Sequence, residues 1–169
     1  MRDASPGTIF LKDYRVPDFL IASTALHFEL FEDHALVHST LQIQRNPASV
    51  DALAELRLDG QQLELVSLAI DGAIQATDQY AIDSDSLTIA GLPDAFELSC
   101  TTRIRPQDNT SLEGLYKSRT MFCTQCEAEG FRKITYYLDR PDVMSVFTVT
   151  VDADQSRYPV LLSNGNLTH

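Results

Sequence analysis

Hydrophobic residues alternate with polar ones over long stretches of the first two thirds of the chain. Leu26, Phe28 and Leu30 stand at every second position, and the same period returns between residues 37 and 43. Successive side chains of a β-strand point to opposite faces of a sheet, so this period is typical of strands with one buried face and one solvated face. The pattern therefore predicts that a sheet begins here.

Turn-forming residues separate the alternating runs. Asp59-Gly60 and Asp71-Gly72 are pairs that tight turns favour, and Glu32 and Asp33 supply an earlier polar turn. The spacing of these turns is close to that of an antiparallel meander or sandwich. Further runs cover 56–58, 63–65, 68–70, 87–89 and 96–104. We therefore expect residues 1–105 to be all-β.

The last third of the chain is more varied. Residues 105–114 have the polar composition of a long connection, and such connections tend to carry function. After an extended run from 116 to 124, residues 128–138 are predicted to form one short helix. The segment Asp139-Arg140-Pro141 would stop that helix, because proline disfavours a helical residue before it. Alternation then returns over 143–151.

A hairpin signal lies close to the end of the chain. Asn164-Gly165 is the dipeptide that most strongly favours a two-residue hairpin turn, yet only four residues follow it. A hairpin that begins without its second strand leads us to expect that the chain is the front piece of a longer protein.

Composition excludes several classes of protein. The chain has 169 residues, 24 Asp and Glu against 13 Lys and Arg, and a formal charge of -11, which argues for one domain and against nucleic acid as a partner. Its 44% hydrophobic content excludes intrinsic disorder. It has no apolar run long enough for a membrane span or an export signal. We therefore expect a soluble, cytoplasmic protein.

Neither the cysteines nor the histidines form a recognisable metal site. Cys123 and Cys126 have redox or metal spacing, but there is no second CxxC, and buried inert cysteines are commoner. His34 and His38 have the i, i+4 spacing of helical zinc ligands, but in a strand their side chains would stand ~13 Å apart. We expect structural or surface roles for these histidines and also for His27 and His169, and no metal ligand in the chain.

Gln125, Glu127 and Glu129 form the most unusual local pattern. In an extended backbone they would share a face, with ~7 Å between successive side chains. Two carboxylates so close repel unless they are fully solvated, lie beside a basic residue, or face a cationic ligand such as the ammonium group of a peptide. On this pattern alone a solvated face is favoured, with Arg132 or Arg140 as counter-ion.

Longer motifs resemble a known family. The segments SLEGLYKS (111–118) and CTQCEAEGFRKITYYLDRPDV (123–143), with DYRVPD (13–18) and YPVLLSNGN (158–166), closely resemble the amino-terminal domain of the bacterial aminopeptidase N family. The resemblance implies that residues 1–169 form one amino-terminal domain. It implies an all-β fold, a large antiparallel saddle or sandwich-like domain with one or two short helices near residues 128–146.

The same resemblance implies a function for the crowded acidic motif. Members of the family are zinc-dependent exopeptidases, in which the first glutamate of a Gln-x-Glu-Ala motif binds the free α-ammonium group of the peptide substrate. Residue by residue, that role falls on Glu127, and Gln125 would help to shape the pocket for the first side chain. The family gives Glu129 no clear role. This implication reverses the preference for a merely solvated face.

The catalytic machinery of that family belongs to a following domain. The chain contains no HExxH segment, so the resemblance implies zinc in the parent enzyme, no zinc ligand and no catalytic residue here, and an inactive fragment. The implied partners are peptides with a free N-terminus and the catalytic domain of the same polypeptide. Two alternatives remain open: a free-standing β-sandwich interaction module without enzymatic activity, and a CxxC redox or metal protein.

Overall fold

The computed structural model describes residues 10–51 and 53–168. These residues form strands, turns and loops, and their only helical elements are two single turns of 3-10 helix, η1 (Leu11–Asp13) and η2 (Phe131–Lys133). The all-β fold class is therefore confirmed. The helix expected over 128–138 shrinks to η2.

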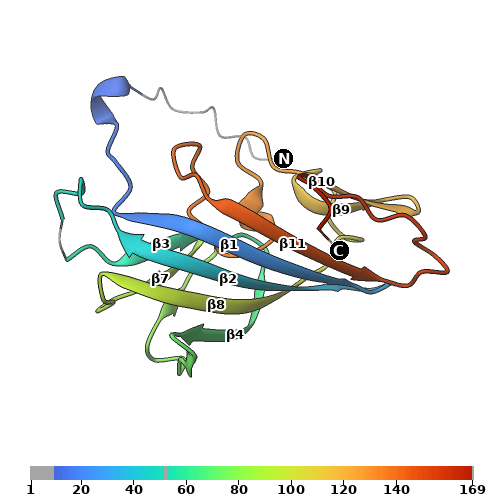
Figure 1. The fold of residues 1–169 in the computed structure, drawn as a ribbon, viewed down its shortest axis with the longest axis horizontal. Helices are drawn as coiled ribbons and strands as arrows, with labels where there is room; N and C mark the ends of the chain where they lie inside the picture. Colours follow the sequence, from blue (N-terminus) through green and yellow to red (C-terminus); the bar gives the residue numbers. More distant parts are fainter. Residues whose placement is uncertain (1–9, 52, 169) are drawn as a thin grey trace.

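A six-stranded sheet forms one layer of the molecule (Figure 1). Its strand order is β11-β1-β2-β8-β4-β5, and all neighbours are antiparallel except β1 and β11, which run parallel at one edge. A parallel pair needs a long crossover connection, which the chain between β1 and β11 supplies. The strands are β1 (Phe19–Leu30), β2 (Ala35–Arg45), β4 (Glu64–Ile70), β5 (Ala73–Ile74), β8 (Ala95–Ile104) and β11 (Val146–Ala153).

Two smaller sheets pack on one face of the large sheet. A three-stranded sheet, in the order β3-β7-β6, shares a hydrophobic core with it that includes Leu41, Leu58 and Leu87. The hairpin β9–β10 shares a second core with it, which includes Leu26 and Leu115. The strands are β3 (Leu56–Asp59), β6 (Ala81–Ile82), β7 (Ser86–Ile89), β9 (Gly114–Ser118) and β10 (Met121–Gln125).

Alternation along the strands decides which face of the large sheet is buried. In β1, Leu26 and Phe28 point into the second core, whereas His27 and Glu29 lie on the outer face and are only half-buried. The register of β1 with β2 follows from the turn between them, which pairs Leu30 with Ala35. The outer face is consequently polar, as the period of two predicts.

Residues 134–139 are buried although they form neither helix nor strand. Their backbone groups bond to other parts of the chain instead: Asp59 and Tyr137 exchange two N–H···O bonds of 2.7 and 3.1 Å, and Thr102 donates to the carbonyl of Ile134 at 3.0 Å. Gly60 leaves room for the ring of Tyr136, because a Cβ there would lie 2.3 Å from two ring atoms. These partners, distant in sequence, explain why the expected helix does not form.

No hairpin forms at Asn164-Gly165 among the described residues. Residues 154–168 contain no strand, and the two residues bend between loop segments. A hairpin turn forms only where a second strand can pair with the first, and no strand follows it among the described residues. The loop instead packs the ring of Tyr158 against that of Phe122, with 5.2 Å between the centroids and 54° between the ring planes.

The core between the two layers generates a stability prediction. Leu58 is fully buried and Leu53 is 90% exposed. Leu58→Ala should lower the free energy of unfolding by about 2–5 kcal/mol, because it removes buried methyl groups and leaves a cavity. Leu53→Ala is the matched control and should change it by less than about 0.5 kcal/mol. Urea unfolding of the chain measures both, and equal effects would contradict the packing described here.

Candidate functional site

A short loop, residues 126–130, joins β10 to η2 and carries Glu127. The loop is fixed at both ends: Cys126 packs against the second core, and Gly130 is buried and donates its N–H to the carbonyl of Cys126 at 3.1 Å. Gly130 has no space for a side chain, since a Cβ would lie 2.8 Å from the carbonyl oxygen of Gln125. The residues between these two anchors are exposed.

The expectation that Gln125, Glu127 and Glu129 share one extended face is wrong. β10 ends at Gln125, and residues 127–130 form a turn in which the peptide bond between Glu127 and Ala128 is cis. The bond between Gly130 and Cys126 closes this turn, so the backbone cannot continue as a strand. The two carboxylates therefore have different surroundings.

Among the residues that the structure describes, Glu129 has a counter-ion and Glu127 does not. The Glu129 carboxylate lies 3.1 Å from the Arg132 guanidinium. Arg140, the other predicted counter-ion, pairs with Asp142 at 2.7 Å. Within residues 10–51 and 53–168, no hydrogen bond or ion pair involves the carboxylate of Glu127, which is exposed. One negative charge on this loop is thus neutralised within the domain, and the other faces solvent.

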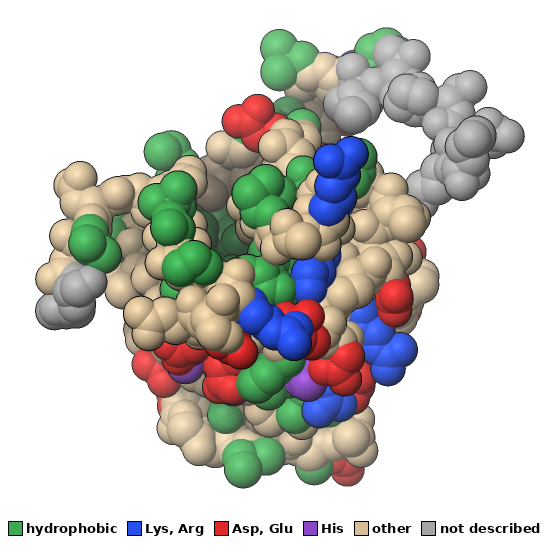
Figure 2. All heavy atoms as spheres, turned by 90° about the vertical axis from the view of Figure 1, so that its right-hand side faces the viewer, with side chains coloured by type: hydrophobic (Ala, Val, Ile, Leu, Met, Phe, Trp, Pro, Cys, Tyr) green, Lys and Arg blue, Asp and Glu red, His purple; other side chains and the backbone are tan. Residues whose placement is uncertain are grey.

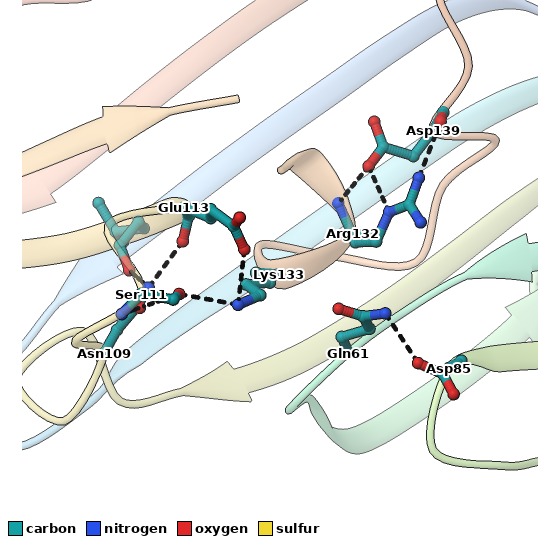
Figure 3. Close-up of polar contacts among 9 residues, drawn as sticks. Gln61, Asp85, Asn109, Ser111, Glu113, Arg132, Lys133 and Asp139 are labelled. Atoms are coloured by element: carbon teal, nitrogen blue, oxygen red, sulfur yellow. Dashed lines mark hydrogen bonds and ion pairs between the residues drawn. The ribbon is translucent and has the colours of Figure 1, made fainter. Parts of the chain in front are cut away.

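Arg132 ties the loop to the three-stranded sheet (Figure 3). Its backbone N–H and its Nε both donate to Asp139 Oδ2, at 3.2 and 2.7 Å, and its Nη2 donates to the carbonyl of Asp139 at 3.1 Å. The N–H of Asp139 in turn donates to Asp59 Oδ2 at 3.1 Å. Because Asp59 ends β3, this chain of bonds fixes η2, and with it the end of the loop, on the core.

Lys133 ties η2 to the long connection before β9. Its Nζ donates to Ser111 Oγ at 2.7 Å and lies 2.9 Å from the Glu113 carboxylate, contacts that Figure 3 also shows. Asn109 closes the connection on itself by donating to the carbonyls of Glu113 and Leu115. The connection over 105–114, which the sequence marks as a candidate for function, therefore braces the loop from its other side.

The cysteines have the character of inert side chains. All three are free, and Cys100 is fully buried, with its Sγ 3.1 Å from Ser39 Oγ. Burial first, and the Asp139 carboxylate second, raise the pKa of Cys126 to about 11. A thiol with so high a pKa keeps its proton at neutral pH and is a poor nucleophile. These surroundings disfavour the CxxC redox alternative.

The structure also assembles residues that the sequence analysis kept apart. His27 pairs with His38 across β1 and β2, and Glu29 lies beside them, with one potential ligand atom of each residue within 4.8 Å of the others. His34, which the spacing had linked to His38, bonds to Asp33 at 2.7 Å instead. The turn at Glu32 and Asp33 was the available signal, because a hairpin centred there places His27 opposite His38. His169 lies outside the described residues.

The surface beside the loop is hollowed and apolar. Figure 2 looks at the end of the molecule that carries β9 and β10, and it shows hydrophobic side chains gathered above a band of charged ones. A hollow of about 240 Å³ on this side includes Met121, Phe122 and Thr124 of β10 and the loop residues Leu161 and Leu162. A second hollow of about 340 Å³ lies elsewhere, and neither is lined by Gln125 or Glu127.

Comparison with known proteins identifies the family. Residues 21–169 match the Peptidase M1 N-terminal domain. The chain belongs to this family. The chain is 46% identical to aminopeptidase N of Caulobacter vibrioides over 98% of its own length, and 45% identical to that of Escherichia coli over 95%. It spans only 19% and 18% of those two relatives, respectively.

A solved structure gives the same result for the fold. Legionella pneumophila aminopeptidase A in complex with aspartic acid superimposes with a TM-score of 0.88 at 32% identity, covering 94% of this chain and 19% of that one. The resemblance stated from the sequence motifs is thus confirmed. The chain spans about a fifth of the length of the proteins to which it is similar.

The raised pKa of Cys126 predicts how its alkylation depends on pH. In a Cys123→Ser variant of the chain, the rate of iodoacetamide modification at Cys126 should rise about tenfold per pH unit and continue to rise past pH 9.5, since only the thiolate reacts. Peptide mapping by mass spectrometry follows the site. A rate that levels off near pH 8.5, the value of an unperturbed thiol, would contradict the prediction.

The Arg132–Asp139 pair predicts a contrast between a buried and an exposed ion pair. The Asp139 side chain is 10% exposed, whereas that of Asp94, which pairs with Arg45, is 92% exposed. Asp139→Asn should lower the free energy of unfolding by about 1.5–3 kcal/mol, because it weakens charged hydrogen bonds in a buried site. Asp94→Asn is the control and should cost less than about 1 kcal/mol. Chemical denaturation that ranks the two variants equally would refute the bracing described for η2.

Proposed function

We propose that this chain is the amino-terminal substrate-recognition domain of a longer zinc-dependent aminopeptidase, and that Glu127 binds the free α-ammonium group of the peptide. The observation that carries this proposal is the contrast within one loop: Glu129 is paired with Arg132, whereas the Glu127 carboxylate is exposed and unpaired among the described residues. An unpaired carboxylate on a fixed loop suits a cation from outside the domain.

The chemistry of an ammonium group fits a carboxylate at this position. An ammonium group presents hydrogen-bond donors and a full positive charge, and hydrogen bonds between charged groups are shorter and stronger than neutral ones. A peptide bond in the middle of a chain carries no such charge, so the same carboxylate would favour the first residue over internal ones. Recognition of the terminus then decides which peptide bond is cut.

The fixed position of the loop makes this recognition effective. A carboxylate on a mobile loop loses conformational entropy when it binds, whereas here Cys126, Gly130 and Arg132 already hold the backbone on both sides of Glu127. Gln125 is exposed at the end of β10, where it pairs with Gly114. We assign to its amide a contact with the first side chain of the peptide.

The zinc of the proposed enzyme belongs to its catalytic domain. The loop itself offers few ligands for a zinc ion, because Cys126 is half-buried and Glu129 is held by Arg132. When bound in the catalytic domain, zinc would polarise the scissile carbonyl and activate water. The part played by this chain is to bind and orient the peptide, and the chain alone is expected to be inactive.

Two further features support a catalytic domain of the same polypeptide as partner. The relatives are about five times longer than this chain, which weighs against the free-standing interaction module. Apolar residues such as Met121 and Leu162, 61% and 90% exposed, lie on β10 and in the loop that lines the same hollow. Exposed apolar surface of this kind is usually covered by a partner.

We propose a cytoplasmic enzyme. The three cysteines of this chain are all free, which suits a reducing compartment. No helix within residues 10–51 and 53–168 has the length and apolar composition that crossing a membrane requires.

The proposal is tested in the full-length enzyme with Glu127→Gln. This isosteric change removes the negative charge, and it should lower kcat/KM for an aminoacyl anilide about 10- to 100-fold, the equivalent of losing a hydrogen bond to a charged group. The zinc content should stay unchanged. Glu129→Gln is the matched control on the same loop, and its kcat/KM should stay within about threefold of the wild type.

A second measurement separates recognition from general damage to the enzyme. A competitive peptide inhibitor with a free N-terminus should lose affinity for Glu127→Gln, whereas its N-acetylated form, which has no ammonium group, should bind both enzymes equally. If both inhibitors weaken to the same extent, or if Glu127→Gln has normal kinetics, Glu127 does not bind the ammonium group.

A further inference from the structure

The outer face of the six-stranded sheet holds a compact group of metal-binding side chains. One potential ligand atom from each of His27, Glu29 and His38 lies within 4.8 Å of the others. His38 Nε2 and Glu29 Oε1 are already 3.0 Å apart. All three side chains are half-buried, with exposed fractions of 39% for each histidine and 34% for Glu29.

Strand register brings these residues together. His27 and Glu29 are two positions apart in β1 and share a face, and the hairpin register places His38 of β2 directly opposite His27. The neighbouring strands contribute from both sides, since β11 pairs Asp152 with Glu29 and β8 pairs Thr101 with His38. Four adjacent strands thus supply one row of side chains.

The flanking residues orient the two imidazoles. The Thr101 hydroxyl lies 3.0 Å from His38 Nδ1, which turns His38 Nε2 toward Glu29. The Asp152 carboxylate lies 2.7 Å from His27 Nε2. Histidines that ligate metal ions commonly have such a hydroxyl, carbonyl or carboxylate on the ring, which fixes the tautomer and raises the basicity of the ligand.

We propose that His27, Glu29 and His38 form a binding site for a divalent transition-metal ion. Two imidazoles and one carboxylate are ligands that suit Zn²⁺, Co²⁺ and Ni²⁺. Tetrahedral coordination by such ligands requires donor atoms about 3.3 Å apart. The His38–Glu29 distance of 3.0 Å is close to this requirement, and the other two separations are at most 4.8 Å.

Charge also favours a cation at this place. With neutral imidazoles, Glu29 and Asp152 give the group two negative charges in a protein whose formal charge is -11. A divalent ion neutralises both. The competing interpretation is two independent ion pairs, His27 with Asp152 and His38 with Glu29, each formed only when the histidine is protonated.

The site is open to solvent and does not depend on the proposed peptide recognition. Most of its neighbours on the outer face are polar, among them Thr40, Ser99, Thr148 and Thr150, while Leu36 lies opposite Glu29. The loop that carries Glu127 follows β9–β10, which packs on the opposite face of the same sheet. Loss of metal binding and loss of peptide recognition are therefore separable results.

This inference departs from the sequence-based expectation that the chain has no metal ligand. For the histidines, that expectation considered only the spacing of His34 and His38, which are not the pair that the hairpin brings together.

The test is titration of the 169-residue chain with Co²⁺ and Zn²⁺, followed by calorimetry and, for cobalt, by visible absorption. The wild type should bind one equivalent and show ligand-field bands of a site with nitrogen and oxygen ligands. His27→Ala and His38→Ala should each weaken binding at least 10-fold and lose the bands. His34→Ala removes a histidine outside the group and is the matched control, which should bind as the wild type does. Far-UV circular dichroism establishes that each variant is folded.

Three results would overturn the proposal. One is wild-type binding no tighter than that of His38→Ala. Another is equal loss in His34→Ala and His38→Ala, which would mean that any histidine on the surface suffices. The third is binding that disappears only when Cys123 and Cys126 are replaced, which would place the metal at the cysteines.

Discussion

A stretch of buried backbone with no regular structure of its own holds the domain together. Residues 134–139 run between the large sheet and the two small ones, so each of their N–H and C=O groups needs a partner that water cannot supply. Asp59, Thr102 and the Arg132 side chain provide several of these partners. Ile134 belongs to the second core and Tyr136 to the first. The same stretch thus joins both cores and, through Arg132 and Asp139, fixes the loop that presents Glu127.

The sequence predicted the strands well because their cause is local. Alternation from residue 26 onward and the Asp71-Gly72 turn each follow from which side chains can be buried and which backbone conformations a tight turn needs. At that turn Asp71 and Gly72 have φ values of 49° and 78°, the left-handed region that such turns require. Nothing distant in sequence is needed to reach these conclusions.

Predictions failed where distant residues decide the conformation. The helical pattern over 128–138 gives way because Asp59, about 80 positions earlier, bonds to Tyr137 and Asp139. Likewise, the extended face expected for Gln125 to Glu129 assumed a strand, whereas the N–H of Gly130 bonds back to the carbonyl of Cys126 and closes a turn. The role of Glu127 came from motif resemblance, and the grouping of His27 with His38 was obtainable from the hairpin turn although spacing along the chain concealed it.

The parallel pairing of β11 with β1 has a consequence for the order in which the chain folds. β1 and β2 are close in sequence and can form a hairpin soon after they leave the ribosome, but β1 gains its second neighbour only when residues 146–153 have been made. Until then β1, the longest strand, is itself at the edge of the large sheet, and its unpaired backbone groups are prone to pair with other chains. The last strand therefore replaces the twelve-residue β1 with the eight-residue β11 at the edge of the sheet, and the loop with Glu127 is synthesised before this exchange takes place.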